Sequence, residues 1–312
     1  MQSILITGGS GSFGQAFVER LLAGQQYGRI AVYSRGEHAQ ETMERKFPDP
    51  RLRFFIGDVR DRDRLEMAMR GIDIVVHAAA LKIVPVAEYN PTECIATNIG
   101  GAENVVKAAL RAKVKTVVGL STDKAVNPIN LYGASKLAAE KIFVAAHNLA
   151  AGACSFSVVR YGNVMGSQGS VVPLFKKFKA EGKPLPITDS RMTRFHITMG
   201  QAISLVEQAI MLREGQRIHV PKIPSVRVTD LARAIDPTGK PHVVGIRPGE
   251  KLHECLLTED EARTTANRNT FYTIHPSGYV PMRHDTMAPD GFRYTSDTNT
   301  DWLTVEQIRA VI

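Results

Sequence analysis

The sequence predicts an α/β fold, a Rossmann-type doubly wound parallel sheet followed by a smaller C-terminal substrate domain. Short apolar runs of strand character alternate with segments whose apolar residues recur at helical intervals, a rhythm typical of parallel βαβ units. The first run, Ser3 to Thr7, leads directly into GGSGSFG and then into a helical pattern from Phe13 to Leu22. Strand, glycine turn and helix start form the context in which proteins bind a dinucleotide.

The composition narrows the class of protein. With 312 residues, 44% of them hydrophobic and 22% charged, the chain can bury a sizeable core in one large or two unequal domains. The net charge of +8 is scattered, which disfavours a nucleic-acid arm and fits anionic small molecules such as phosphates. Three widely spaced cysteines form no C-x-x-C pair, and the most apolar stretch, Ile72 to Val86, is too short and too interrupted to span a bilayer. We therefore expect a soluble cytoplasmic protein with no membrane and no nucleic-acid partner.

The glycine turn after the first strand fits a dinucleotide fingerprint. Gly9, Gly11 and Gly14 satisfy G-x-G-x-x-G, and Gly8 with the last two satisfies the wider G-x-x-G-x-x-G spacing. Glycines permit the tight turn and let backbone N–H groups approach a pyrophosphate at the helix N-terminus. A glycine-rich turn in an unrelated loop is the alternative, which the flanking strand and helix disfavour. A P-loop nucleotide hydrolase is also disfavoured, because glutamine and alanine follow Gly14 where lysine and then serine or threonine would be needed.

The second strand, Arg29 to Ser34, ends where an NAD site carries an acidic residue for the ribose 2′-hydroxyl. Ser34 and Arg35 stand in its place, and an arginine suits a 2′-phosphate because it can donate bidentate hydrogen bonds. We therefore predict NADP rather than NAD as the cofactor. The alternative is that Arg35 is an ordinary solvated side chain.

The following segments continue the alternation and place small or polar residues after strands. Asp58 and Val59 would lie where the adenine rests, and the alanines after His77 would let a flat ring approach the backbone. Lys82 could reach a substrate phosphate or hydroxyl. His77 is interpreted as a packed strand residue, and no metal site is predicted because no second histidine or acid stands at metal spacing. The expected elements are a helix at Glu37–Lys46, a strand at Leu52–Ile56, a helix at Arg62–Met69, a strand at Asp73–His77 and a long helix at about Pro91–Ala112 with Asn98 near its start.

A tyrosine and a lysine follow the next strand at helical spacing. The strand is expected at 116–121, and a helix begins at about Leu131 and continues through His147. Tyr132 and Lys136 are four residues apart, so this helix places them one turn apart on one face. A neighbouring ammonium favours the ionised form of a phenol, which makes Tyr132 a candidate base for a substrate hydroxyl. An ordinary surface pair is the alternative, and the position downstream of the glycine turn disfavours it.

Three polar residues lie just past the end of the same strand: Thr122, Asp123 and Lys124. They would offer a hydroxyl, a carboxyl and an amine to one cleft. An acid and a base in one cleft are useful only if their environments push their pKa values apart. For its amine to act as a base, Lys124 would have to be neutral for part of the time, which requires desolvation or the nearby positive charge of Lys136.

Beyond residue 163 proline, glycine and irregular stretches become denser, which indicates a domain boundary. Residues 1–163 would form the cofactor domain and 164–312 mostly the substrate domain, with 195–220 returning to the first. Several arginines in this half would lie beyond the carboxyl ends of strands, where ligands of such sheets bind. The expected elements are a strand at Ser155–Arg160, a loop at Ser167–Ser170, a helix at Val172–Lys179, a helix at Gly200–Leu212, a loop at Gly245–Lys251, a polar surface excursion over Glu259–Asp301 and a short helix at Trp302–Ile312.

The segment TGGSGSFG, Asn98 and the Tyr132/Lys136 pair resemble those of the extended short-chain dehydrogenase/reductases. Four longer segments, STDKAVNPINLYGASK, RYGNVMGSQGSVVP, ITDSRMTRFHIT and IRPGEKLHE, look like the inverting UDP-N-acetylglucosamine 4,6-dehydratases of the pseudaminic acid pathway. The likeness runs from Ser3 to SDTNTDWLTVEQ, nearly the whole chain. Sugar dehydratases that retain configuration typically carry Asp-Glu where this chain has Asp123-Lys124.

The resemblance implies a redox-neutral reaction on UDP-N-acetylglucosamine with NADP. Tyr132 takes the proton from the carbon 4 hydroxyl while NADP accepts the hydride, and Lys136 holds the ribose and lowers the pKa of the phenol. Lys124 removes the hydrogen of carbon 5 and Asp123 protonates the departing hydroxyl of carbon 6. Thr122 hydrogen-bonds the substrate near carbon 4. Hydride returns to carbon 6 and carbon 5 is reprotonated from the opposite face, giving a UDP-4-keto-6-deoxy-L-arabino-hexosamine.

The same resemblance implies the residues that bind the ligands, and a homo-oligomer assembled through helices of the sheet domain. The cofactor would be lined by Gly8, Ser10, Gly11, Ser12, Phe13, Gly14, Ser34, Arg35, Glu37, His38, Ala39, Asp58, Val59, Ala79, Thr97, Asn98, Tyr132 and Lys136. The nucleotide sugar would be held by Lys82, Asn163, Val171, Arg247 and Glu250.

Other functions would share this fold. A nucleotide-sugar 4-epimerase or a simple oxidoreductase would not need the acid and base of Asp123 and Lys124, and a retaining 4,6-dehydratase is a further alternative. A non-catalytic NADP-sensing protein is disfavoured by the intact Tyr132 and Lys136. A purely structural Rossmann domain would explain neither Asp123 and Lys124 nor Arg247.

Overall fold

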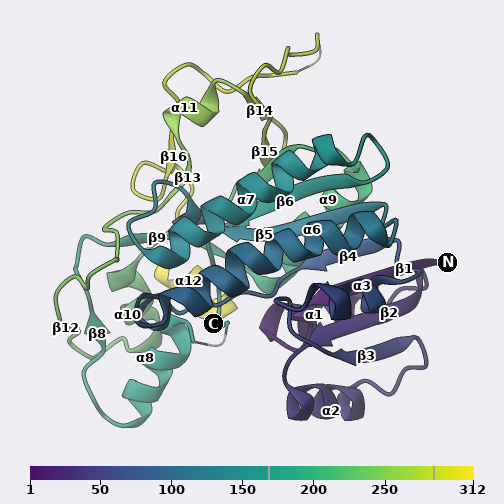
Figure 1. Cartoon of the computed structure of the whole chain (residues 1–312). Helices are drawn as coiled ribbons and strands as arrows, with labels where there is room; N and C mark the ends of the chain where they lie inside the picture. Colours follow the sequence, from purple (N-terminus) through teal and green to yellow (C-terminus); the bar gives the residue numbers. More distant parts are fainter. Residues whose placement is uncertain (168, 284) are drawn as a thin grey trace.

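The computed structural model describes residues 1–167, 169–283 and 285–312, and its centre is a nine-stranded sheet (Figure 1). The strand order is β14-β15-β10-β6-β5-β4-β1-β2-β3, in which β15 is antiparallel to both neighbours and all other neighbouring pairs are parallel. The order 3-2-1-4-5-6 of the first six strands is that of a doubly wound Rossmann sheet, which confirms the predicted fold class. The strands are β1 (Gln2–Thr7), β2 (Tyr27–Ser34), β3 (Leu52–Ile56), β4 (Ile74–His77), β5 (Thr116–Thr122), β6 (Ser155–Tyr161), β10 (Arg217–Pro221), β14 (Thr265–Asn267) and β15 (Phe271–Ile274).

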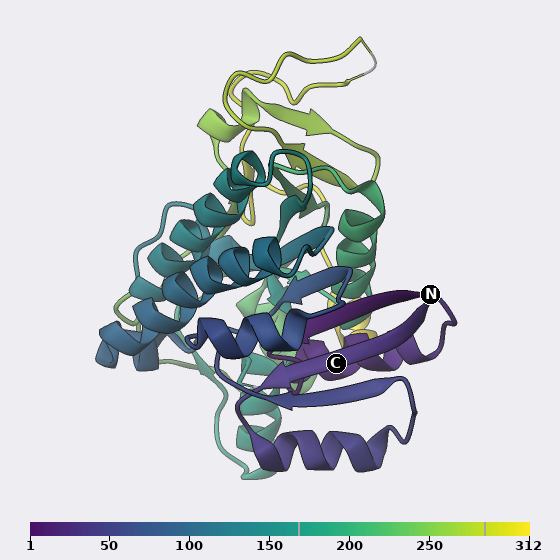
Figure 2. The same cartoon turned by 45° about the vertical axis from the view of Figure 1, so that its right-hand side comes forward.

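Helices flank this sheet in two groups. α6 contacts both α3 and α7, whereas α1 contacts α9, and the two groups lie on opposite faces (Figures 1 and 2). Ile4, Leu5 and Ile6 of β1 are completely buried, as expected for a central parallel strand covered on both sides. The helices are α1 (Ser12–Leu22), α2 (Glu37–Lys46), α3 (Arg62–Met69), α6 (Gly101–Arg111), α7 (Leu131–Leu149) and α9 (Met199–Leu212).

The long helix predicted at about Pro91–Ala112 is interrupted. α5 (Pro91–Ile95) runs into a π-helical turn at Ala96–Gly100 before α6 begins. Asn98 lies in this turn: its Oδ1 accepts from the backbone N–H of Leu81 (2.8 Å) and its Nδ2 donates to the carbonyl of Leu81 (3.0 Å). Such turns are frequent at functional sites, and helical periodicity alone does not reveal them.

A second apolar cluster lies apart from the sheet. It includes Phe175 of α8 (Val171–Ala180), Leu231 of α10 (Val228–Ile235) and Ile308 of α12 (Val305–Val311). Short strands accompany these helices: β9 (Thr193–Ile197) pairs with β7 (Asn163–Val164) on one side and β11 (Ser225–Arg227) on the other, and β8 (Pro186–Ile187) pairs with β12 (His242–Val243). The division at residue 163 stays a prediction, although α9 packs against β5, β6 and β10 of the large sheet.

Two parts of the chain differ from the expectation. The short helix α4 (Val84–Tyr89) was not predicted, because its six residues are too few to show a period. The surface excursion expected over Glu259–Asp301 is wrong in part, since β14 and β15 extend the large sheet and β16 (Tyr294–Thr295) pairs with β13 (Cys255–Leu257). These strands have two to four residues and mix polar with apolar side chains, so their sequence carries little alternation. The same stretch holds α11 (Glu259–Ala262). The predicted loop at Ser167–Ser170 includes position 168, which lies outside the described residues.

Within the described residues, no helix has both the length and the apolar character needed to cross a membrane. The same residues contain no group of three or more His, Cys, Asp or Glu side chains placed to hold a metal ion.

Candidate active site

The turn between β1 and α1 needs glycine at two positions. Gly8 has a φ of +66°, and a Cβ there would lie 2.8 Å from the backbone nitrogen of Ala79. A Cβ on Gly14 would collide with the backbone of Gly9. Gly11 is the N-cap residue of α1 and has no side chain. The first N–H groups of the helix therefore receive no hydrogen bond from a capping side chain. This geometry fits a pyrophosphate at the N-terminus of α1.

Gln40 of α2, which sequence reasoning missed, organises the end of β2. Its amide nitrogen donates to the carbonyl and hydroxyl oxygens of Ser34 and to the carbonyl of Phe55, each at 2.9 Å. The hydroxyl of Ser10 donates to the Ser34 hydroxyl, also at 2.9 Å, so the glycine turn and the strand end are held together. Gln40 occupies a buried position on a helix that is otherwise rich in charged residues, and this position is the only signal that the sequence offers for it.

Arg35 follows β2, and its guanidinium lies 3.7 Å from Asp58 Oδ2. Asp58 also pairs with Arg60 at 2.7 Å, and Arg60 reaches Glu93 at 2.6 Å. Although burial raises the pKa of Asp58, its hydrogen bonds with Arg60 and the charge of Arg35 lower it below the usual value. Two guanidinium groups therefore lie beside one carboxylate, and that carboxylate would compete with a 2′-phosphate for Arg35.

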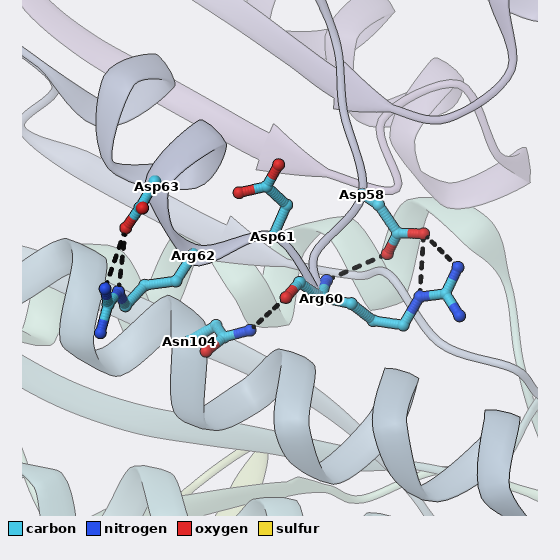
Figure 3. A pocket seen from close by; sticks show the side chains of 6 residues that line it. All are labelled: Asp58, Arg60, Asp61, Arg62, Asp63 and Asn104. Atoms are coloured by element: carbon cyan, nitrogen blue, oxygen red, sulfur yellow. Dashed lines mark hydrogen bonds and ion pairs between the residues drawn. The ribbon is translucent and has the colours of Figure 1, made fainter.

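A surface hollow of about 640 Å³ adjoins this carboxylate (Figure 3). Figure 3 shows Asp58 facing Arg60, while Asn104 of α6 donates to the Arg60 carbonyl at 2.9 Å. The hollow lies past the end of β3, on the side where the adenine was expected, and no predicted catalytic residue lines it. Its lining residues are Asp58, Arg60, Asp61, Arg62, Asp63 and Asn104.

Asn98 and Ser135 connect the cofactor region to α7. Asn98 Nδ2 donates to Ser135 Oγ at 2.9 Å, and Ser135 Oγ donates to the carbonyl of Tyr132 at 2.7 Å. Thr97, next to Asn98, is buried, and its hydroxyl has no hydrogen-bond partner in the described part of the chain. A buried hydroxyl without a partner fits a ligand group at this place.

The other residues predicted to line the cofactor lie around this region. Val59 is buried, and a Cβ on Gly101 would lie 2.8 Å from its side chain. Ser12 and Phe13 open α1, and Glu37, His38 and Ala39 open α2, all of them at least partly exposed.

Tyr132 and Lys136 are both buried in α7, as the spacing predicts for one helix face. Burial raises the pKa of Tyr132 to about 12, although the charge of Lys124 and a hydrogen bond with Thr122 lower it. The expectation that the ionised phenol is favoured is wrong for this structure, because burial outweighs the neighbouring cation. Burial lowers the pKa of Lys136 to about 8, with Glu140 acting in the opposite direction.

The predicted acid and base meet at the end of β5. Asp123 begins a 3₁₀ turn and is completely buried. Its Oδ1 accepts from the hydroxyl of Thr122 at 2.9 Å and from Lys124 Nζ at 3.0 Å. Its Oδ2 has no hydrogen-bond partner among the described residues. Lys124 Nζ also donates to Asn163 Oδ1 at 3.1 Å, so one predicted substrate residue touches the acid–base pair directly.

Two carboxylates beside Lys124 decide its charge in this structure. Burial lowers the pKa of Lys124, but the carboxylates of Asp123 and Glu254 raise it well above its usual value. Lys124 is therefore an ammonium in this structure, and the proximity of Lys136 does not neutralise it.

Glu254 was also missed from the sequence, although it ends the quoted segment IRPGEKLHE. It is 3% exposed, and its Oε1 lies 3.6 Å from Lys124 Nζ and 3.8 Å from Arg194 Nε. Its Oε2 lies 3.8 Å from Lys251 Nζ. A buried glutamate is rare without a partner. The position of Glu254 within this quoted segment is the only sequence signal that could have found it.

The remaining predicted substrate residues are carried by other segments of the chain. Asn130, the N-cap of α7, donates to the carbonyl of Gly249 at 2.8 Å, which holds the loop carrying Arg247 and Glu250 against the start of α7. Arg247 itself is half-exposed and lies 3.8 Å from Glu250. Lys82 follows β4, and burial lowers its pKa. Val171 begins α8 and packs against the second apolar cluster.

Comparison with known proteins identifies the family to which the chain is similar. Residues 4–276 match the model of a family described as polysaccharide biosynthesis protein. The inverting UDP-N-acetylglucosamine 4,6-dehydratase of Campylobacter jejuni subsp. jejuni serotype O:2 is 48% identical over 324 residues, covering 100% of this chain and 97% of that protein. The UDP-glucose 4-epimerase of Rickettsia akari is 41% identical over 285 residues, covering 89% of this chain and 84% of that protein.

Solved structures agree on the architecture. Pen from Bacillus thuringiensis is similar with a TM-score of 0.93 and 36% identity, covering 100% of this chain and 97% of that chain. DesIV from Streptomyces venezuelae, a dTDP-glucose 4,6-dehydratase solved with NAD, is similar with a TM-score of 0.74 and 24% identity, covering 80% of this chain and 87% of that chain. At that identity the second likeness shows the fold alone.

Proposed function

The chain belongs to the polysaccharide biosynthesis protein family, and from that membership we propose that it acts as an inverting UDP-N-acetylglucosamine 4,6-dehydratase. It is a hydro-lyase, which removes one water from the sugar of its nucleotide-sugar substrate. The observation that carries the proposal is the buried contact of 3.0 Å between Lys124 Nζ and Asp123 Oδ1, with Tyr132 beside it. An amine and a carboxyl in contact can together move the two protons that a dehydration requires.

The residues of the chain take three roles in this reaction. Tyr132 accepts the proton of the carbon 4 hydroxyl, helped by the Lys124 charge and the Thr122 hydrogen bond that lower its pKa against burial. Lys124, once neutral, removes the proton of carbon 5, which the new ketone at carbon 4 acidifies. Asp123, which is completely buried, gives its proton to the departing hydroxyl of carbon 6.

The cofactor region fits a nicotinamide dinucleotide, because it offers a glycine cradle that a Cβ would fill, an uncapped helix N-terminus and a buried hydroxyl without a partner on Thr97. When bound, the nicotinamide would accept hydride from carbon 4 and return it to carbon 6. Lys136 would hold its ribose side. We propose NADP on the evidence of Arg35 and Arg60 beside Asp58, where a 2′-phosphate would gain two cationic neighbours.

A substitution tests the choice of cofactor. Arg35→Ala should weaken NADP binding by roughly 10- to 100-fold, the effect of losing one charged hydrogen bond of ~1.5–3 kcal/mol, and should leave NAD binding unchanged. Arg45→Ala on the exposed side of α2 is the matched control, because its guanidinium pairs with Glu41 instead. Calorimetric titration of each variant with both dinucleotides gives the result, and equal losses for NADP and NAD would contradict the assignment.

UDP-glucose 4-epimerase is the second candidate, favoured by the 41% identity to the Rickettsia protein. Neither the Asp123 carboxyl nor the Lys124 amine has a task in an epimerisation at carbon 4, which leaves carbon 5 and carbon 6 untouched. Mass spectrometry separates the two. UDP-N-acetylglucosamine incubated with the protein and NADP should lose the mass of one water, whereas an unchanged mass with an altered sugar would support the epimerase.

The setting of the reaction remains a set of predictions. Supply of the product to pseudaminic acid or a related surface glycan and a homo-oligomeric assembly follow from the family resemblance, and a cytoplasmic location follows from the cysteine pattern of the sequence. Analytical ultracentrifugation of the purified chain would test the oligomer.

A further inference from the structure

The acid–base pair belongs to a cluster of five charges, and the three other members have no role in the steps described above. They are Glu254, Arg194 of β9 and Lys251, a residue of the loop before β13. Glu254 lies 3.6 Å from Lys124, 3.8 Å from Arg194 and 3.8 Å from Lys251. It is 3% exposed, so these contacts are formed with little solvent screening.

The three residues are themselves held in place. Arg194 donates to the carbonyls of Thr193 (2.7 Å), Leu252 (3.0 Å) and Lys251 (2.9 Å). Lys251 Nζ donates to the carbonyl of Val126, in the turn that carries the acid–base pair.

Glu254 is fixed through its backbone as well: its N–H donates to Ser296 Oγ at 2.9 Å, and its carbonyl accepts from the Ser296 N–H at 2.8 Å. These two hydrogen bonds hold the backbone that carries the Glu254 carboxylate, which lies 3.6 Å from Lys124.

We propose that Glu254 is a positioning residue for the elimination, and that it holds the Lys124 ammonium against Asp123 until one proton passes from Nζ to Oδ1. In this transfer one N–H bond of the ammonium breaks and one O–H bond forms on the carboxylate, and solvent supplies no proton. The ion pair becomes a neutral amine and a carboxylic acid, which are the base and the acid that the proposed dehydration requires. This inference rests on the proposed function.

The cycle then closes without an outside proton. The amine takes the proton of carbon 5, and the electron pair of that C–H bond forms the double bond to carbon 6. The C–O bond at carbon 6 breaks, and the acid gives its proton to the departing hydroxyl, which leaves as water. Lys124 is again an ammonium and Asp123 again a carboxylate, as in the structure.

The groups that face Lys124 explain why Lys124 and Asp123 are both charged before substrate binds. Asp123 and Glu254 favour the ammonium, Arg194 disfavours it and Tyr132 favours it weakly. A substrate that fills the cleft and covers Asp123 Oδ2, which has no hydrogen-bond partner among the described residues, would favour the neutral pair. Removal of the Glu254 charge should therefore release the proton of Lys124 more easily.

Amine acylation tests this directly, because acetic anhydride reacts with neutral amines and not with ammonium groups. Glu254→Gln keeps the shape and removes the charge, and Glu259→Gln on the exposed first turn of α11 is the matched control. Peptide mass mapping gives the acetylation rate of Lys124 relative to exposed Lys141 in the same molecule. At about pH 8 the ratio should rise by roughly tenfold or more in Glu254→Gln, the effect of a pKa lowered by one. An unchanged ratio would overturn the inference.

Turnover gives a second readout. Glu254→Gln should lower kcat by about tenfold or more with KM for UDP-N-acetylglucosamine within about twofold, because the lost contact positions the base and not the substrate. Glu254→Asp retains the anion and guards against a failure of the first variant to fold; it should keep the Lys124 acetylation ratio closer to that of the unaltered protein. If the glutamine variant matches Glu259→Gln in kcat, Glu254 is not a positioning residue. If acetylation rises but the unaltered protein makes no dehydrated product, the charge arrangement stands and the proposed function fails.

Discussion

Replacement of Lys124 by methionine removes the proposed base while it keeps an unbranched side chain of similar length. The neighbouring cations cannot take over. Arg194 does not deprotonate in proteins, and Lys251 Nζ is bonded to the Val126 carbonyl. Lys136 lies one helical turn beyond Tyr132 in α7, where the resemblance gives it the cofactor ribose. The full contribution of a general base, about 10²–10⁴-fold in kcat or ~2.7–5.4 kcal/mol in the activation free energy, should therefore be lost.

The contacts of Lys124 also determine how much Lys124→Met should lower the free energy of unfolding. Loss of one partner from a buried ion pair typically costs ~3–5 kcal/mol. The cost here should be smaller, because the Thr122 hydroxyl still donates to Asp123 at 2.9 Å. Glu254 also keeps Arg194 and Lys251 as partners.

Three measurements decide the outcome for Lys124→Met: the rate of dehydrated product by mass spectrometry, the NADP affinity by calorimetry, and the free energy of unfolding in urea. Product formation should fall by the stated factor, while NADP affinity should change by less than about twofold. Lys107→Met, which breaks an exposed pair with Glu103 on α6, is the control and should leave all three quantities unchanged. Undiminished dehydration by a folded Lys124→Met protein would refute the role of Lys124.

Three further outcomes are expected. Tyr132→Phe should lower the rate of dehydration by about 10²–10⁴-fold with the fold intact, and exchange of the carbon 5 hydrogen with solvent should stop as well, since no ketone forms; continued exchange measured by NMR would contradict this role. The pKa of Lys136 is lowered to about 8, so the folded protein without cofactor carries a penalty of about 3 kcal/mol below that pH which fades as pH rises toward 10.5. Lys136→Met should thus raise the free energy of unfolding at about pH 7 and not at about pH 10.5, and a gain independent of pH in urea titrations would refute the cause. Arg160 pairs with buried Glu140 at 2.7 Å and with Glu261 at 2.8 Å, so Arg160→Met should destabilise the fold by about 3–5 kcal/mol in the same titrations, and a change below about 1 kcal/mol would contradict the contribution of this ion pair.

The parts of the site that sequence could predict are those set by local order along the chain. The glycine turn follows β1 directly, Asp123 and Lys124 follow β5 directly, and Tyr132 precedes Lys136 by one helical turn. In a parallel sheet the carboxyl ends of neighbouring strands meet at one edge, so these segments converge without any knowledge of packing.

The parts that sequence could not predict depend on contacts between distant segments. Glu254 reaches Lys124 only because the loop before β13 packs against the turn after β5, a pairing of residues 130 positions apart. The adjacent Asp123 raises the pKa of Lys124 most, and this distant contact with Glu254 raises it further, which the sequence alone did not show. The π turn at Asn98 depends in the same way on hydrogen bonds to Leu81.

Dehydration carried out in deuterated water tests the central claim most directly. If Lys124 and Asp123 remove water across carbons 5 and 6, NMR of the product from UDP-N-acetylglucosamine should show a 4-keto sugar with a carbon 6 methyl, one deuterium at carbon 5 and inverted configuration there. A product that keeps the protium of carbon 5, or a galacto-configured sugar that still carries its carbon 6 hydroxyl, would contradict the account.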